Sequence, residues 1–293
     1  MTVSETGPIR FNLQAEMRSR SQWRSIAESA EQSGFEALYV PDHPRSSASP
    51  FVALAAAAAV TERIKLGTYV VNAGVWDPLP LATEVATLDV VSGGRAVFGI
   101  GAGHTPTEWT DRDMMYPSAS ERVDRMVKTA IATRAWLADL GDPAPIQDPV
   151  PLLVGGNGRR VLDFAATHAD IVGITGLGAT LADGHTHAAH WSTSAIDERL
   201  APLRASGRPI VVDALVQFVA LTDDRGAVAQ QLAAEHSLVA DDLLACPYAF
   251  IGTVEQIVAD LIEARRRWGI TRYTLRPSAV RVVEQLVPVL EGQ

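Results

Sequence analysis

The sequence predicts a single (β/α)8 barrel with loop insertions that extends over residues 1–293. Strand-like and helix-like segments alternate along the whole chain, the two halves do not differ in composition, and no low-complexity linker separates them. A content of 47% hydrophobic and 20% charged residues is enough for one large buried core. A doubly wound open sheet is the alternative, because counting elements separates the two folds poorly.

The first strand–helix unit shows the pattern that the later units repeat. Residues 10–14 form a short predicted strand with Phe11 and Leu13 on one face. The helix after it ends at Gly34. Its apolar residues recur at the spacing i, i+3, i+4 and i+7 of a buried stripe, namely Trp23, Ile26, Ala27 and Ala30.

Seven further units follow in order. The strands are predicted at 37–42, 65–72, 96–103, 151–155, 170–174, 210–221 and 272–276. The helices are predicted at 51–60, 79–91, 120–138, 159–168, 193–205, 226–240, 254–268 and 280–290. Two helix starts carry local signals. Pro50 follows Ser49 as a first helical residue follows its N-cap, and Thr253 with Gln256 forms a capping box.

Charge and cysteine content exclude several classes of protein. The net charge of −9 argues against a nucleic-acid-binding protein, which would show a basic face. The single cysteine, Cys246, excludes an intrachain disulfide and fits a buried thiol in a reducing compartment. No stretch has the pattern of a secretory leader or the length of a membrane span. We expect a soluble cytoplasmic protein without nucleic-acid or membrane partners, flexible at residues 1–8.

Unusual residues at strand ends are candidate site residues, because the loops after the strands of a barrel build its catalytic face. Pro41-Asp42-His43-Pro44 follows the second strand. A carboxylate beside an imidazole can orient the ring, hydrogen-bond the edge of a heterocycle or move a proton near neutral pH. A turn whose side chains bond the local backbone is the alternative interpretation.

A glycine-rich segment at 99–103 follows the fourth strand and is succeeded by His104. It is not a dinucleotide-binding fingerprint, because its third glycine comes one residue early and no helix clearly opens there. The missing Cβ atoms would let a flat ring approach the backbone. Tight strand packing inside the barrel would use the same glycines.

The segment Gly-Gly-Asn-Gly-Arg-Arg at 155–160 leads from the fifth strand directly into a helix. Glycines before a helix N-terminus expose backbone N–H groups to an anion, and the helix dipole favours negative charge there. Arg159 and Arg160 would add charge-assisted hydrogen bonds to a phosphate. This segment is the most specific physical signal in the chain and predicts a phosphate site.

Three histidines, His185, His187 and His190, lie in the loop after the sixth strand and raise the hypothesis of a zinc hydrolase. Their spacing is not His-Glu-x-x-His, and the first strand has no His-x-His. We therefore interpret this loop as solvated or substrate-facing and predict no metal site. Trp76 and Trp109 lie in loops after strands and are candidates for the walls of a ring-binding pocket.

The chain resembles the luciferase-like monooxygenase superfamily and, within it, the branch that depends on the deazaflavin coenzyme F420. The resemblance covers nearly the whole chain and is closest at 86–103, which begins with Ala-Thr-Leu-Asp-Val-Val-Ser-Gly-Gly-Arg at 86–95 and ends with the glycine-rich 99–103. The other matching positions are 39–43, 64–68, Glu108, 151–158 and 250–253. The resemblance implies a TIM barrel of the bacterial-luciferase type.

The resemblance also implies roles for single residues. Asp42 and His43 would contact the polar edge of the deazaflavin ring. Tyr69 and Val70, joined by a cis peptide, would form a bulge that supports the back face of the ring. The residues implied beside the ring and substrate are Gly103, His104 and Thr107. Those implied around the cofactor phosphate are Gly155, Gly156, Asn157 and Gly158, with Arg159 next to them. Asp89 and Arg95 are implied to be scaffold residues.

Three positions depart from the family pattern. His104 stands where sugar-phosphate-oxidising relatives have a proton-donating glutamate, which argues against that class of substrate. Asp77-Pro78 stands where many relatives have His-Pro, and residues 139–150 lack a hairpin that is common in the family. The substrate therefore stays open.

The sequence thus predicts a deazaflavin-dependent oxidoreductase that exchanges a hydride with a small organic substrate. His43 or His104 would handle the proton. Asp42 would hold His43 in place as a contact to the polar edge of the cofactor, and His104, nearer to the substrate, is assigned the proton handling. The alternatives are an FMN-dependent monooxygenase on the same barrel and a barrel that binds cofactor weakly or not at all and acts as a partner or carrier. Relatives are often dimers, so a homodimer is compatible with the resemblance.

Overall fold

The computed structural model describes residues 7–180 and 187–292, and within them eight parallel strands close into a barrel. The barrel strands are β1 (Arg10–Gln14), β2 (Ala37–Val40), β3 (Lys65–Thr68), β5 (Ala96–Gly101), β6 (Leu152–Gly155), β7 (Ile171–Ile174), β10 (Val211–Leu215) and β13 (Ile270–Leu275). The pairing of β3 with β5 completes the ring, and β4 (Val71–Asn72) continues the third strand along β5. The predicted barrel is confirmed. A doubly wound open sheet is excluded, because such a sheet has two unpaired edge strands and here β3 pairs with β5.

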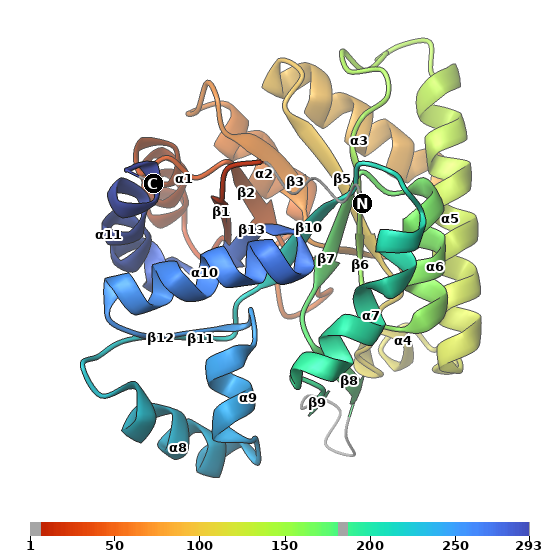
Figure 1. The fold of residues 1–293 in the computed structure, drawn as a ribbon. Coiled ribbons are helices and arrows are strands. Elements are labelled where there is room, and N and C mark those ends of the chain that lie inside the picture. The colour runs from red at the N-terminus through yellow and green to blue at the C-terminus, as the bar shows by residue number, and fades with distance from the viewer. Residues whose placement is uncertain (1–6, 181–186, 293) are drawn as a thin grey trace.

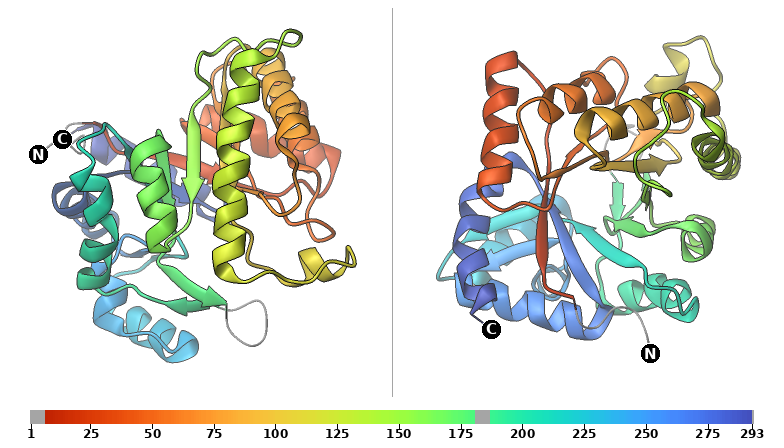
Figure 2. Two further views of the ribbon diagram at one scale, coloured as in Figure 1. Left: turned by 90° about the vertical axis from the view of Figure 1, so that its right-hand side faces the viewer. Right: turned by 90° about the horizontal axis from the view of Figure 1, so that it is seen from above.

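Helices surround the barrel, as Figures 1 and 2 show. They are α1 (Arg20–Gln32), α2 (Pro50–Ala58), α3 (Pro78–Ser92), α5 (Ala119–Asp139), α6 (Arg159–His168), α7 (Thr193–Ala205), α10 (Val254–Trp268) and α11 (Val280–Glu291), the last preceded by the 3-10 turn η1 (Pro277–Ala279). The capping box of Thr253 and Gln256 is present. Pro50 occupies the start of α2, although the Ser49 side chain makes no cap hydrogen bond. Among the described residues, no helix combines the length and hydropathy needed to cross a membrane.

The loop insertions gather at the end of the barrel that lies at the bottom of Figure 1 and of the left view in Figure 2. They comprise α4 (Thr107–Thr110), β8 (Leu177–Thr180), β9 (His187–Ala189), β11 (Phe218–Leu221), α8 (Arg225–His236), α9 (Ala240–Ala245) and β12 (Ala249–Gly252). Each follows the carboxyl end of a barrel strand, so this end is the mouth where function is expected.

Two elements in this region exist but are shorter than predicted. The strand predicted at 210–221 leaves the barrel after Leu215, and its second half pairs with β12 in a separate two-stranded sheet. The helix predicted at 226–240 ends at His236, where Ser237 adopts a left-handed conformation with φ of 55°. An apolar run shows that a strand will form but not which partner it will pair with.

Asp89 and Arg95 hold the base of the barrel, as expected of scaffold residues. The buried Asp89 carboxylate accepts hydrogen bonds from the backbone N–H groups of Ile146 at 2.7 Å and Gln147 at 2.8 Å, and from the Gln147 side chain at 2.6 Å. Arg95 donates to backbone carbonyls that include Ile64 at 2.7 Å and Ser92 at 2.6 Å. The Asp89 contacts anchor the segment around Ile146 and Gln147, and the Arg95 contacts tie the end of α3 to the start of β3.

A polar layer crosses the interior of the barrel. The fully buried carboxylate of Asp213 on β10 accepts a hydrogen bond from Asn12 Nδ2 at 2.8 Å and from Thr274 Oγ1 at 2.8 Å. All three donors and acceptors lie on neighbouring strands, where side chains of one face meet. Burial raises the pKa of Asp213 to about 6, and the hydrogen bonds from Thr274 and Asn12 work in the opposite direction.

Candidate functional site at the barrel mouth

Asp42 lies directly after β2 and is buried beneath the loop that follows β4. Its Oδ2 accepts hydrogen bonds from Trp76 Nε1 at 2.8 Å and from the backbone N–H of Asn72 at 3.2 Å. Burial raises the pKa of the Asp42 carboxyl, and the hydrogen bond from Trp76 works in the opposite direction. Asp42 therefore fixes the loop 72–76, and Trp76 packs edge-on against Phe51 with ring centroids 5.3 Å apart.

His43 is held by Glu108 and not by Asp42, which corrects the expectation from the sequence. Its Nδ1 lies 2.7 Å from Glu108 Oε1, and the hydrogen bond to this carboxylate raises the pKa of His43. The Glu108 side chain is 4% exposed, whereas the His43 side chain is 37% exposed. The imidazole thus reaches the mouth while its partner stays buried.

Glu108 is carried by the short helix α4, a helix that the sequence did not predict. Its second oxygen, Oε2, accepts a hydrogen bond from Asn72 Nδ2 at 2.6 Å. Neither Asn72 nor Glu108 was assigned a functional role on the basis of the sequence. Both could have been considered, because Asn72 is a polar residue at the end of a predicted strand and Glu108 is an acid that follows the glycine segment. They join the loops after the second, third and fourth barrel strands into one polar network.

The loop after β5 brings His104 to the same network. The rings of His43 and His104 meet edge to face with centroids 5.6 Å apart. The backbone carbonyl of Gly103 accepts from Arg122 Nε at 2.9 Å, and that of His104 accepts from the Tyr116 hydroxyl at 2.9 Å. Thr107, the first residue of α4, is exposed. The two predicted proton-handling histidines are therefore neighbours.

The structure confirms the strand-packing interpretation of the glycine segment, while the approach of a ring to its backbone stays a prediction. A Cβ at Gly99 would lie 1.7 Å from the backbone oxygen of Thr68, so this glycine allows β3 and β5 to close the barrel. Gly103 has φ of 72°, and a Cβ there would lie 2.2 Å from Asn72 Oδ1. Gly99 is thus needed for strand packing, and Gly103 is needed at the mouth.

Tyr69 and Val70 are joined by a cis peptide bond, as the resemblance implied. The Tyr69 ring is buried in the barrel, while Val70 is only partly buried. Cβ atoms at Gly101 and Gly155 would lie 2.5 Å and 2.8 Å from the methyl groups of Val70. Val70 is therefore an apolar platform flanked by two glycines.

In the predicted phosphate site at residues 155–160, the N-terminus of α6 is accessible to an anion. We call these residues the phosphate cradle. Gly158 is its N-cap and provides no side-chain cap, and a Cβ at Gly158 would have no heavy atom within 4 Å. The backbone N–H of Gly156, in contrast, already donates to the carbonyl of Gly173 at 3.1 Å. The first-turn N–H groups after Gly158 are the donors that an anion could use.

The polar side chains of the cradle bond elsewhere in the protein. Asn157 Nδ2 donates to Thr175 Oγ1 at 2.7 Å and to the carbonyl of Leu177 at 2.9 Å, so this side chain ties the cradle to the loop after β7. Arg159 pairs with Asp163 at 2.8 Å on the exposed face of α6. Contacts of these two side chains with a phosphate stay a prediction that would require them to change partners.

The structure also bears on the predicted pocket wall at Trp109 and on the histidine loop. Trp109 is 2% exposed and packs against Gly74, so it is a core residue and not a pocket wall. His185 lies outside the described residues, while His190 is exposed. No group of three or more potential metal-ligating side chains occurs within residues 7–180 and 187–292.

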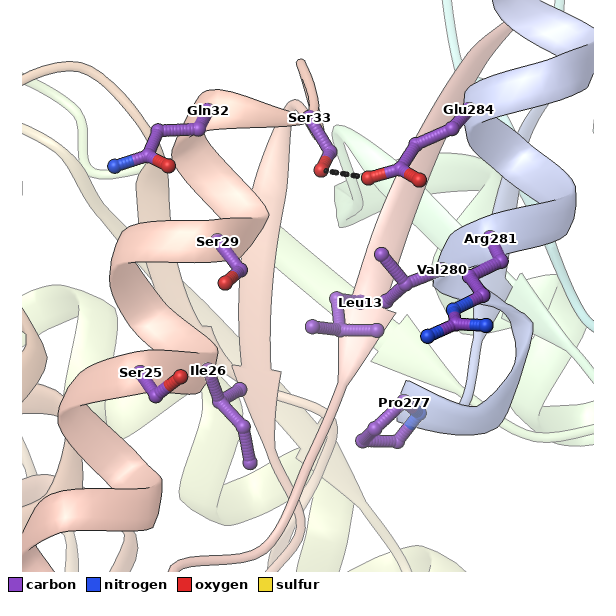
Figure 3. Close-up of a pocket in the computed structure, with 10 residues that line it drawn as sticks. All are labelled: Leu13, Ser25, Ile26, Ser29, Gln32, Ser33, Pro277, Val280, Arg281 and Glu284. Atoms are coloured by element: carbon purple, nitrogen blue, oxygen red, sulfur yellow. Dashed lines mark hydrogen bonds between the residues drawn. The ribbon is translucent and has the colours of Figure 1, made fainter.

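A groove of about 620 Å³ runs between α1 and α11 on the outside of the barrel (Figure 3). Serine side chains of α1 form one wall, and Arg281 and Glu284 of α11 lie on the other. Ser33 Oγ donates to Glu284 Oε1 at 2.8 Å across the groove. None of the mouth residues lines this groove, so it is separate from the candidate site.

The apolar Val70 side chain, a buried polar network and an open helix N-terminus thus lie at the mouth of a closed α/β barrel, the end where such barrels carry their functional sites. Residues 9–214, more than half of the chain, match the family model described as luciferase-like monooxygenase. The chain belongs to this family.

Three comparisons show the range of its relatives. An uncharacterized protein of Mycobacterium tuberculosis is 31% identical over 173 residues, which are 46% of this chain and 61% of that protein. An F420-dependent glucose-6-phosphate dehydrogenase of Nakamurella multipartita is 28% identical over 56% of this chain and 55% of its own length. The structure of the monooxygenase RslO1 from Streptomyces bottropensis superposes with a TM-score of 0.74 at 22% identity and covers 96% of this chain and 99% of its own.

Proposed function

We propose that this chain is an oxidoreductase that binds coenzyme F420 across the barrel mouth and exchanges a hydride with a small organic substrate. The observation that carries the proposal is the packing of the partly buried Val70 side chain between Gly101 and Gly155, where a Cβ atom at either glycine would clash with its methyl groups. Asp42 and His43 follow β2, and the open N-terminus of α6 follows Gly155, at the same end of the barrel. These features suit a planar ring with a polar edge and a phosphate-bearing chain.

A bound deazaflavin would supply the hydride chemistry, and the chain would supply positioning and proton handling. Val70 would support one face of the ring, and the N–H groups after Gly158 would bind the phosphate. His43 can hold or move a proton at the mouth, because its imidazole is half-exposed and a buried carboxylate stabilises its charged form. His104, which touches the His43 ring, would lie beside the substrate.

Cofactor choice tests the proposal directly. We expect F420 to bind about tenfold more tightly than FMN, a difference of roughly 1.4 kcal/mol in binding free energy. The measurement is a fluorescence titration of the two cofactors under identical conditions. The dehydrogenase from Nakamurella multipartita, whose name states F420 dependence, supports this order.

An FMN-dependent monooxygenase is the second candidate, because FMN has a ring and a phosphate that the same platform and helix terminus fit. The family description and the likeness to the monooxygenase RslO1 favour it. Tighter binding of FMN would select this candidate. Failure of both cofactors to bind would instead favour a barrel that acts as a carrier or partner.

The phosphate site can be tested without straining the fold by replacing Gly158 with aspartate. Gly158 has φ of −69° and ψ of 143°, which aspartate adopts readily, and aspartate is a good N-cap. We expect the stability of the protein to rise by a few tenths of a kcal/mol. Cofactor affinity should fall at least about tenfold, because the new carboxylate occupies the donors and repels the phosphate.

The matched control is Gly141→Asp, which adds the same charge in an exposed loop where a Cβ would also meet nothing within 4 Å. It should leave cofactor affinity unchanged. If Gly158→Asp also binds the cofactor normally, the phosphate does not lie at the N-terminus of α6. Gly156 is a poorer test position, because its φ of 151° strains any other residue.

A further inference from the structure

The hydrogen-bond partners of Asn72 allow only one orientation of its side-chain amide. The backbone N–H of Gly74 points at Asn72 Oδ1 from 2.8 Å. A backbone N–H can only donate, so this atom must be the amide oxygen. The amide nitrogen Nδ2 therefore faces Glu108 Oε2 at 2.6 Å, and the Oε2 atom accepts the hydrogen bond.

The orientation of Asn72 determines what Glu108 offers to His43. With Oε2 accepting from Asn72, the second oxygen, Oε1, lies 2.7 Å from His43 Nδ1. A carboxyl group is a much stronger acid than an imidazolium, so the hydrogen between these atoms resides on the nitrogen. An ionised carboxylate has only acceptor atoms, and it selects the ring form with hydrogen on Nδ1.

We propose that Glu108, oriented by Asn72, is a positioning residue that holds His43 in its Nδ1–H form, so that Nε2 is the ring nitrogen that gains and loses a proton at the barrel mouth. The catalytic meaning of this inference rests on the proposed function, but the state of the ring does not. The other charged groups that face His43 are Asp42 beside it and Glu16 beyond the end of β1. Neither makes a hydrogen bond to the imidazole in the described structure.

The substitution Glu108→Gln should invert the ring form of His43 with almost no change in shape. The new amide must present its oxygen to Asn72 Nδ2, because the Asn72 amide cannot turn. Its NH2 group then donates to His43 Nδ1, which must lose its hydrogen, and the neutral ring takes the Nε2–H form. The matched control Glu16→Gln removes a nearby charge without touching this hydrogen bond and should leave the ring form unchanged.

A double variant tests whether the hydrogen-bond chain from Asn72 through residue 108 sets the ring form of His43, or whether Glu108→Gln only disturbs the local structure. In Asn72→Asp with Glu108→Gln, the aspartate still accepts from the Gly74 N–H and also accepts from the NH2 group of the new glutamine. The glutamine then turns its oxygen toward His43 Nδ1, and the Nδ1–H form returns. A purely structural role for Glu108 gives no reason for a second substitution to restore the original ring form.

The experiment is long-range ¹H–¹⁵N NMR of the histidine rings in the cofactor-free chain, followed through a pH titration until His43 is neutral, with thermal melting to verify folding. We expect Nδ1–H in the wild type and Glu16→Gln, Nε2–H and a lower His43 pKa in Glu108→Gln, and Nδ1–H again in the double variant. An Nε2–H wild type, or an unchanged ring in Glu108→Gln, would overturn the proposal. A folded double variant that stays Nε2–H would overturn the part assigned to Asn72. Because no cofactor is present, a failure of F420 to bind would count against the proposed function alone.

Discussion

Replacing His43 with glutamine is expected to lower turnover by about 10²–10⁴-fold, the loss that accompanies removal of a general acid or base. Glutamine can still donate a hydrogen bond to Glu108 Oε1, so the buried carboxylate keeps a partner and the fold should persist. Cofactor affinity should change much less than turnover. The measurement is kcat together with cofactor Kd, with any substrate that the enzyme converts.

His104→Gln is the matched variant for this experiment, because His104 is the other predicted proton-handling residue and its ring contacts that of His43. The buried carboxylate behind His43 leads us to expect the larger loss at His43. A larger loss in His104→Gln would transfer the proton-handling role to His104. A loss in His43→Gln that appears wholly in cofactor affinity would make His43 a ring contact only.

The substitution Asp213→Asn is expected to stabilise the protein relative to the wild type, and this difference in stability should grow as pH rises from about 4 to 7. The folded-state pKa of Asp213 is about 6, above its ordinary value of 3.8, so the folded protein binds more protons than the unfolded chain between these values. The stability that Asp213 contributes is therefore fully present below the unfolded pKa and is lost as pH rises through about 6. The shift corresponds to about 3 kcal/mol.

Asp213→Asn lacks this loss because an amide does not ionise. The Asn12 amide, whose Oδ1 has no hydrogen-bond partner in the described structure, can turn to accept from the new side chain. The difference in unfolding free energy between variant and wild type, measured by urea denaturation across this pH range, should grow with pH. The exposed carboxylate of Asp139 provides the control, since Asp139→Asn should give a difference that hardly depends on pH. A constant difference for Asp213→Asn would show that Asp213 is ionised throughout.

The local sequence determined the elements and the end of the barrel where the candidate site lies. Alternating apolar runs and helical stripes depend on the period of each element, so the barrel strands and most helices could be predicted within a few residues. Glycine positions were also informative, because Gly99, Gly101 and Gly103 allow close approaches that no side chain would permit. The resemblance to a known family correctly implied the cis peptide between Tyr69 and Val70.

Only the tertiary structure decided which side chains become partners. His43 and Glu108 are 65 residues apart, and closure of the barrel brings their loops together. The adjacent Asp42 was the obvious partner in the sequence, but it bonds Trp76 and the backbone of Asn72 instead. Likewise, the apolar run at 210–221 did not reveal that its second half pairs with β12. Hydrogen bonds and strand pairs depend on the relative placement of distant segments, which local periodicity and propensity do not specify.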